Sequence, residues 1–241
     1  MPFNIDPVSG ANQRRTLGMV TARWEWRTFS TLPFPTIVST GSLEASMVRA
    51  LHERDSSPSR ELYFVSERAP HNVKIRESRL QVKRLISVNR TGLQQWRPIL
   101  DTTFPIGGVR LRAFYTALGI VRTSLPGRYY DQLDLIESAL LCDPTLRTVD
   151  LIKHRRPIQL RDCTGEHVTL TIAGRQWYSL AFEHDDPTRL RIILQRLGLT
   201  SLPNTSYPAF LTRATGSQCT TSSTLGTSAE AIPFHNNTEV P

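Results

Sequence analysis

The chain has 241 residues, 39% of them hydrophobic, and its 29 Lys and Arg against 21 Asp and Glu give a formal net charge of +8. This length suffices for one sizeable core, and the charge favours anionic partners such as phosphorylated molecules, polyphosphate or nucleic acid. Three widely spaced cysteines exclude a disulfide framework and a zinc finger, and no apolar run is long enough to span a bilayer. We therefore expect a cytoplasmic protein without a membrane anchor.

The two ends of the chain lack any sustained hydrophobic period. Residues 1–20 carry prolines and a glycine among polar residues and predict a flexible leader. Residues 214–241 are rich in Ser, Thr and Gly and predict a disordered tail, because such a segment buries too little apolar surface to offset its ordering entropy. One domain is expected over residues 21–213.

The first part of this domain contains four candidate strands, each combining β-branched or aromatic residues with alternating polarity. They span about residues 22–29, 60–66, 72–77 and 79–88. Between the first two, Leu43, Met47 and Leu51 recur at helical spacing behind Ser42, a plausible N-cap. This pattern predicts a helix over 42–54.

The middle of the domain contains two candidate helices, over about 108–118 and 129–141. In the second helix, Leu133, Ile136 and Leu140 fall on one stripe, the spacing of a helix that packs one face on a core.

The last part of the domain contains four more candidate strands and a helix. The strands span about 148–155, 157–162, 166–173 and 176–184, and the helix covers 187–199, with a proline in its first turn. Because the strands come in short-linked pairs, we expect antiparallel hairpins in an α+β fold. Eight strands suit a closed antiparallel β-tunnel or barrel, flanked by helices.

Cations repeat on the polar faces of these strands, where residues two apart share a face. The rows are Arg23, Glu25 and Arg27; Lys74 and Arg76; and Lys153 and Arg155. If the sheet closes with its apolar faces outward, these cations line one lumen, where a bound anion would offset their mutual repulsion. The alternative is that each polar face looks at water, as one side of an antiparallel sheet commonly does.

Carboxylates accompany the cations on the same faces. Glu25 lies within the first row, and Glu183 and Asp185 share a face of the last strand, whereas His184 lies on the other face. Carboxylate oxygens are the ligands that Mg²⁺ and Mn²⁺ prefer beside phosphate. The pattern predicts a divalent-metal site in the lumen.

Residues 23–27 (RWEWR) resemble the E-x-E-x-K motif that opens the CYTH superfamily, the triphosphate tunnel enzymes. Glu25 stands at the second Glu of the motif, Arg27 replaces its Lys, and Arg23 stands where the first Glu is expected.

Later segments are similar to further motifs of this superfamily, and the likeness covers roughly residues 20–213. Two segments look like its basic strands, and Lys83 falls in the second; Lys153 and Arg155 match a later basic strand. Residues 181–185 are similar to its closing E-x-E strand, with Asp185 replacing the second Glu. The two basic segments are residues 72–76 and 81–84, and the C-terminal end of the likeness covers residues 197–211.

The resemblance implies an eight-stranded tunnel that hydrolyses a triphosphate or polyphosphate anhydride with Mg²⁺ or Mn²⁺. The implied substrate-binding residues are Arg23, Arg27, Lys74, Arg76, Lys83, Lys153 and Arg155. The implied catalytic residues are Glu25, Arg27, Lys74, Arg76 and Glu183, and the implied metal ligands are Glu25, Glu183 and Asp185.

Two other functions fit the same residues. Because Arg23 replaces a motif carboxylate, the tunnel could hold polyphosphate or a nucleotide without hydrolysing it. A nucleic-acid-binding protein would also suit the net charge and the four tryptophans. We favour it less, since Trp24 and Trp26 lie on an apolar strand face, where core packing is expected.

Overall fold

The computed structural model describes residues 21–34, 57–125, 127–160 and 163–216. The leader, the helix expected over 42–54 and the chain from residue 217 onward lie outside these ranges. None of the described helices is long and apolar enough to cross a membrane.

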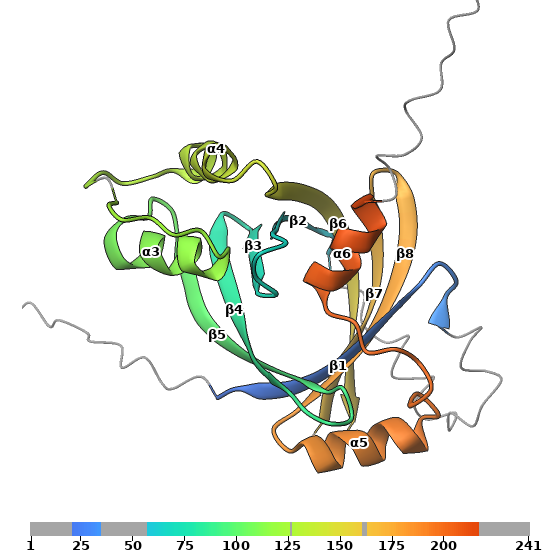
Figure 1. Cartoon of the computed structure of the whole chain (residues 1–241). Helices are drawn as coiled ribbons and strands as arrows, with labels where there is room; N and C mark the ends of the chain where they lie inside the picture. Colours follow the sequence, from blue (N-terminus) through green and yellow to red (C-terminus); the bar gives the residue numbers. More distant parts are fainter. Residues whose placement is uncertain (1–20, 35–56, 126, 161–162, 217–241) are drawn as a thin grey trace, which may run out of the picture.

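Eight antiparallel strands form one closed barrel, in the order β1-β5-β4-β3-β2-β6-β7-β8 (Figure 1). The strands are β1 (Arg23–Ser30), β2 (Ser59–Val65), β3 (Asn72–Arg76), β4 (Arg79–Val88), β5 (Gln94–Thr103), β6 (Arg147–Leu160), β7 (Cys163–Ile172) and β8 (Arg175–His184). The helices are α3 (Gly108–Ala117), α4 (Gln132–Cys142), α5 (Pro187–Arg196) and α6 (Tyr207–Gly216). The α+β antiparallel barrel expected from the sequence is confirmed, and α6 extends three residues into the expected tail.

Two strand assignments made from the sequence are wrong, although the number of strands is right. The segments 148–155 and 157–162 form one strand, β6, which continues through Pro157. Strand β5 was missed because Pro98 lacks an N–H and obscures the strand pattern. The structure accommodates Pro98 opposite Lys83, beside a shift of the β4–β5 register.

Tight turns set the register of two hairpins. Glu77 and Ser78 join β3 to β4, and Ala173 and Gly174 join β7 to β8, all four with positive φ. Two-residue turns of this kind match the right-handed twist of paired strands. They fix which side chains face the barrel interior.

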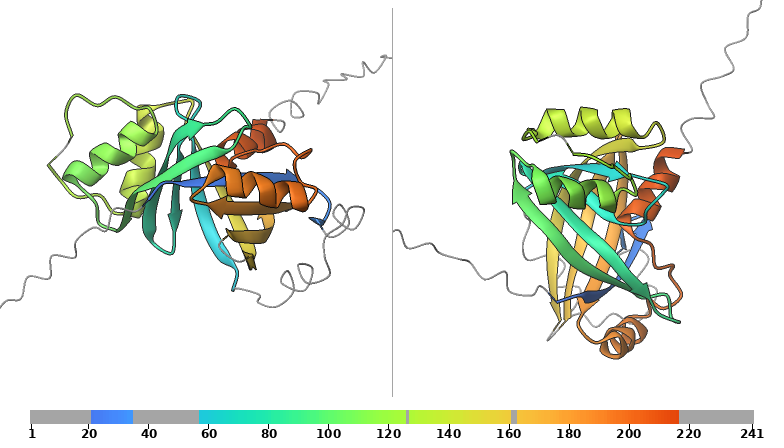
Figure 2. Two further views of the ribbon diagram at one scale, coloured as in Figure 1. Left: turned by 90° about the horizontal axis from the view of Figure 1, so that it is seen from below. Right: turned by 60° about the vertical axis from the view of Figure 1, so that its left-hand side comes forward.

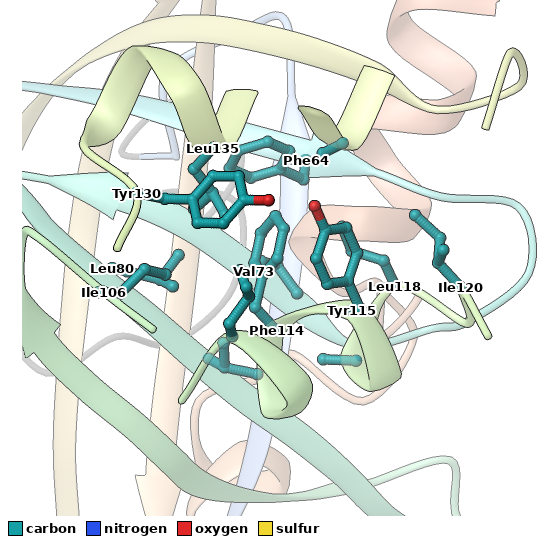
Figure 3. Close-up of a cluster of buried hydrophobic side chains, with 14 of the residues drawn as sticks. Phe64, Val73, Leu80, Ile106, Phe114, Tyr115, Leu118, Ile120, Tyr130 and Leu135 are labelled. Carbon is teal, nitrogen blue, oxygen red and sulfur yellow. The ribbon is translucent and has the colours of Figure 1, made fainter. Parts of the chain in front are cut away.

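Helices α3 and α4 cover the outer face of the barrel (Figures 1 and 2). Phe64 and Val73 of the strands pack against Phe114 of α3 and Leu135 of α4, all nearly inaccessible to solvent (Figure 3). The stripe expected on α4 is only partly right: Ile136 packs against the core, but Leu135 and Ala139 are the buried residues, whereas Leu133 and Leu140 are exposed. The helix is therefore rotated relative to the predicted stripe.

Helix α5 covers the outer face of β1 and β8. It begins after Asp186, whose side chain accepts a 2.7 Å hydrogen bond from the amide of Thr188. Leu190 and Leu194 of the helix pack in one core with Trp26 and Phe182. The apolar strand faces thus point outward against helices, as the closed-lumen hypothesis requires.

Helix α6 packs against the inner face of the barrel. Phe210 and Leu211 share a core with Tyr63, Leu151 and Val168. Each of these strand residues lies two positions from Glu61, Lys153 or Glu166, so it shares the interior face of its strand. In Figure 1, α6 lies beside β6 and β7 at one end of the barrel. Helix α6 therefore fills one end of the barrel and leaves the remainder hollow.

The segment that leads into α6 is bonded to β1. The amide of Arg27 donates to Oδ1 of Asn204 at 2.8 Å, and the amide of Thr205 donates to the carbonyl of Arg27 at 2.7 Å. Strand β1 pairs with β5 only from Arg23 to Glu25. Asn204 and Thr205 therefore satisfy the backbone of β1 where β5 has diverged, and they position α6.

Candidate functional site

A cavity of about 340 Å³ occupies the hollow part of the barrel. Every strand and α6 contribute to its lining. Its charged lining residues are Arg27, Lys74, Arg76, Lys83, Lys153 and Arg155, with Glu25, Asp101, Glu166 and Glu183. Six of the seven predicted substrate-binding residues are thus brought together in one lumen.

The cavity has a mouth and a floor. At the mouth, the side chains of Lys83 and Arg76 are 42% and 34% exposed. At the floor, the side chain of Lys153 is 2% exposed and Tyr207 of α6 is 4% exposed. The cations therefore form a series that leads from solvent to a closed end.

Glu61 on β2 is completely buried and does not itself line the cavity. Its carboxylate lies 2.9 Å from Nζ of Lys153, 3.2 Å from Nζ of Lys74 and 3.9 Å from a guanidinium nitrogen of Arg76, and it also pairs with Arg155. Burial alone would raise the pKa of Glu61, but Lys153, Lys74 and Arg155 hold it well below its usual value. Glu61 is a permanent counter-ion to four cations.

Arg27 organises the opposite wall of the lumen. Its guanidinium donates to Glu25 at 2.8 Å, to Glu166 at 2.9 Å and to the hydroxyl of Ser179 at 3.0 Å. Burial would raise the pKa of Glu166, but Arg27, Lys153 and Arg155 lower it to about 2. Both carboxylates that flank Arg27 therefore stay ionised.

Two tyrosines and a lysine form the floor. Nζ of Lys153 donates to the Tyr63 hydroxyl at 2.7 Å and lies 3.4 Å from the ring centroid of Tyr207. The guanidinium carbon of Arg27 lies 4.7 Å from the same centroid. Cations over aromatic faces are stabilised by the ring quadrupole, so the floor holds two buried cations beside one ring.

Burial disfavours the charged form of Lys74 and Lys153, and Glu61 opposes this effect only in part. Burial, opposed in part by Glu61, lowers the pKa of Lys74 to about 8. Burial likewise lowers the pKa of Lys153 well below its usual value, again against the pull of Glu61. Desolvation disfavours the ammonium form of both side chains, and an added anion would favour it.

The three predicted metal ligands are not brought together. Glu25 and Glu183 are register partners on β1 and β8, but Asp185 is 73% exposed and pairs with Arg23 at 3.1 Å. Arg23 also lies 3.8 Å from Glu183, outside the cavity lining. Among the described residues, no three carboxylate, histidine or cysteine side chains gather as a metal-binding group. The donor set present does not fit the expected three-ligand site.

The pKa values of Glu25 and Glu183 nevertheless shift in opposite directions. Burial would raise the pKa of Glu25, but Arg27 and Lys83 lower it. Burial raises the pKa of Glu183, and Glu25 adds to this effect against the opposing pull of Lys83. Two adjacent carboxylates with divergent proton affinities are a common arrangement at functional sites.

The fold and the site define a closed eight-stranded antiparallel barrel with a basic, one-ended internal cavity. This architecture fits the tunnel fold that the sequence resemblance implies. No protein-family model and no curated protein matches the sequence.

Solved structures with similar folds include a putative adenylate cyclase from Bacillus halodurans, 12% identical, covering 76% of this chain and 93% of that one, with a TM-score of 0.36. A protein from Pyrococcus horikoshii OT3 is 12% identical over 76% of this chain and 97% of its own, with a TM-score of 0.39. A conserved hypothetical protein from Pyrococcus furiosus is 12% identical, covering 76% of this chain and 98% of that one, with a TM-score of 0.37. A likeness this weak carries no functional conclusion.

Proposed function

We propose that the barrel binds a triphosphate or polyphosphate anion in its lumen. The observation that supports this function is the convergence of six Lys and Arg side chains from four strands on one cavity with a closed floor. The cavity volume of about 340 Å³ lies at the lower end of the range of small-molecule pockets, roughly 300–1,000 Å³.

The charge balance favours an anion over a cation as the ligand. Six cations line the cavity against four carboxylates, and the buried Glu61 does not line it. Glu25 and Glu166 are bonded to Arg27, and Glu183 lies 3.6 Å from Lys83. Asp101 pairs with Arg79 at 2.8 Å, so all four carboxylates already have cationic partners, while the lowered pKa of Lys74 favours the arrival of negative charge.

An extended anion suits the series of cations better than a compact one. Lys83 and Arg76 at the mouth can hold one end of a phosphate chain, and Arg27 and Lys153 lie at the floor. Arg and Lys bind phosphate oxygens through short, charge-assisted hydrogen bonds. A linear phosphate chain can contact the cations at the mouth and those at the floor at the same time.

Titration calorimetry with tripolyphosphate tests this binding. We expect Lys83→Gln to weaken affinity about tenfold, because one charge-assisted contact at the mouth is lost. Arg60→Gln is the matched control, since Arg60 is an exposed cation that pairs with Asp150 outside the cavity lining. Unchanged affinity in Lys83→Gln, or an equal loss in Arg60→Gln, would contradict a lumenal site.

Metal-dependent hydrolysis of the bound anion is the second candidate function, favoured by the facing pair Glu25 and Glu183. Carboxylates beside a phosphate chain are ligands of the kind that Mg²⁺ or Mn²⁺ uses. Release of orthophosphate from tripolyphosphate, measured with EDTA, Mg²⁺ or Mn²⁺, separates the two functions. If orthophosphate release depends on the metal and Glu183→Gln abolishes it, the protein is a hydrolase. If tripolyphosphate binds tightly and no orthophosphate is released, the protein is a binding module.

A further inference from the structure

The hydroxyl of Tyr207 is a buried polar group without a hydrogen-bond partner among the residues that the structure describes. Tyr207 lines the cavity at its floor and is 4% exposed. A buried donor without an acceptor costs stability, so native structures rarely keep one without a reason. The position of Tyr207 in the lining of the cavity supplies such a reason.

The cations beside Tyr207 contact its ring, and its hydroxyl accepts no hydrogen bond from them. Lys153 and Arg27 lie over the ring, and Lys153 donates its hydrogen bond to Tyr63. Burial raises the pKa of Tyr207, so the phenol keeps its proton and acts as a donor. A second residue of the cavity lining, Asn72, also has a buried side-chain oxygen, Oδ1, without a hydrogen-bond partner within the described ranges. The cavity is therefore incomplete as a hydrogen-bonding environment.

We propose that the hydroxyl of Tyr207 donates a hydrogen bond to the terminal phosphoryl group of the bound chain, which makes Tyr207 a specificity-determining residue of the floor. This inference rests on the proposed function. Because α6 closes the floor, the group that reaches Tyr207 is the end of the chain, flanked by Arg27 and Lys153. The ligand class is an anion that ends in an unesterified phosphoryl group.

The experiment compares Tyr207→Phe with the wild type by titration calorimetry and denaturant unfolding. The variant keeps the ring, its packing and its cation contacts, and it removes one oxygen. We expect about tenfold weaker binding of linear tripolyphosphate, since one hydrogen bond to a charged group is lost. The unfolding midpoint of the ligand-free variant stays equal or rises, because the unpartnered hydroxyl is gone.

Tyr115→Phe is the matched control, a buried tyrosine of the outer core. Its hydroxyl shares a 2.8 Å hydrogen bond with Ser138 and accepts another from Arg122. We expect this variant to lose stability and to keep its affinity for tripolyphosphate, the reverse of the result for Tyr207→Phe.

Cyclic trimetaphosphate, which has three phosphates and no terminal phosphoryl group, tests the role of the chain end. The wild type should prefer the linear anion, and Tyr207→Phe should lose most of that preference. Equal affinity of Tyr207→Phe and wild type for tripolyphosphate, while Lys83→Gln binds more weakly, overturns the role of Tyr207 alone. A wild type that does not bind tripolyphosphate overturns the proposed function and this inference together.

Discussion

At the residue scale, the fully buried Glu61 is the charge on which the cationic wall depends. Lys74, Lys153, Arg76 and Arg155 all lie within ion-pair distance of its carboxylate. Removing one partner of a buried ion pair leaves uncompensated charge in a low-dielectric interior. The same four cations line the cavity, so in the proposed binding site Glu61 competes with the anion for their charge.

We expect Glu61→Gln to lower the free energy of unfolding by about 3–5 kcal/mol. Tripolyphosphate should raise the unfolding temperature of this variant more than that of the wild type, since the anion replaces the missing counter-charge. Asp150→Asn is the control, because Asp150 pairs with the exposed Arg60 and such pairs contribute at most about 1 kcal/mol. Thermal unfolding with and without tripolyphosphate measures both effects, and equal ligand-induced shifts would contradict the counter-ion role.

At the element scale, helix α6 converts an open barrel into a one-ended site. The ring of Phe210 stacks on Phe29 with 3.9 Å between centroids and meets Trp177 edge-on at 5.1 Å. Asn204 and Thr205 bond the preceding segment to β1. The helix is thus held by packing inside the barrel and by hydrogen bonds at its start.

Phe210→Ala should destabilise the protein by about 3–5 kcal/mol, the usual loss when a buried phenylalanine is truncated. It should also weaken tripolyphosphate binding, because the altered packing of α6 displaces Tyr207 at the floor. Leu133→Ala, on the exposed face of α4, is the control and should change neither quantity measurably. Chemical denaturation and calorimetry provide the two measurements, and an unaffected affinity would show that α6 does not set the floor.

At the scale of the whole molecule, the barrel closes by a short seam. Strands β1 and β5 pair through three residue pairs, Arg23–Trp96, Trp24–Gln95 and Glu25–Gln94. Strands β6 and β7 pair through ten, from Leu151–Ile172 to Leu160–Cys163. Fewer strand-pairing interactions must break for the barrel to open locally between β1 and β5 than between β6 and β7.

Native-state hydrogen exchange should therefore show faster exchange along the β1–β5 seam than in the β6–β7 hairpin. Those amides of Gln94–Trp96 that donate to β1 report on the seam, and those of Val168–Leu170 that donate to β6 report on the hairpin. Equal protection of the two sets would contradict a weak seam and indicate that the barrel opens only by global unfolding.

The polar strand faces could be read from the sequence because their residues alternate with apolar ones. Val73 and Ile75 oppose Lys74 and Arg76, and the structure places the two cations in the cavity. Glu61 alternates with Leu62 in the same way, so this rule could have placed its carboxylate on the interior face of β2. Strand β5 was harder to predict, since Pro98 disrupts the pattern and only pairing with β4 supports the strand.

Which residues of a polar strand face reach the cavity could not be predicted from the sequence, because it depends on their position along the barrel. Arg23, Glu25 and Arg27 share a strand face, but only Glu25 and Arg27 line the cavity. Arg23 lies near the start of β1, where it reaches the exposed Asp185 just beyond β8. Alternation states which face a side chain occupies, and it does not state how far along the barrel that side chain lies.

The sequence by itself determined the antiparallel barrel and the cations of its interior, because a period of two is a local property of strands. Only the tertiary structure decided that α6 fills one end of the barrel, that Glu61 compensates four cations and that Tyr207 forms the floor. These features join residues far apart in the chain. Closure of the barrel and insertion of the helix bring them together, and no local pattern records those distances.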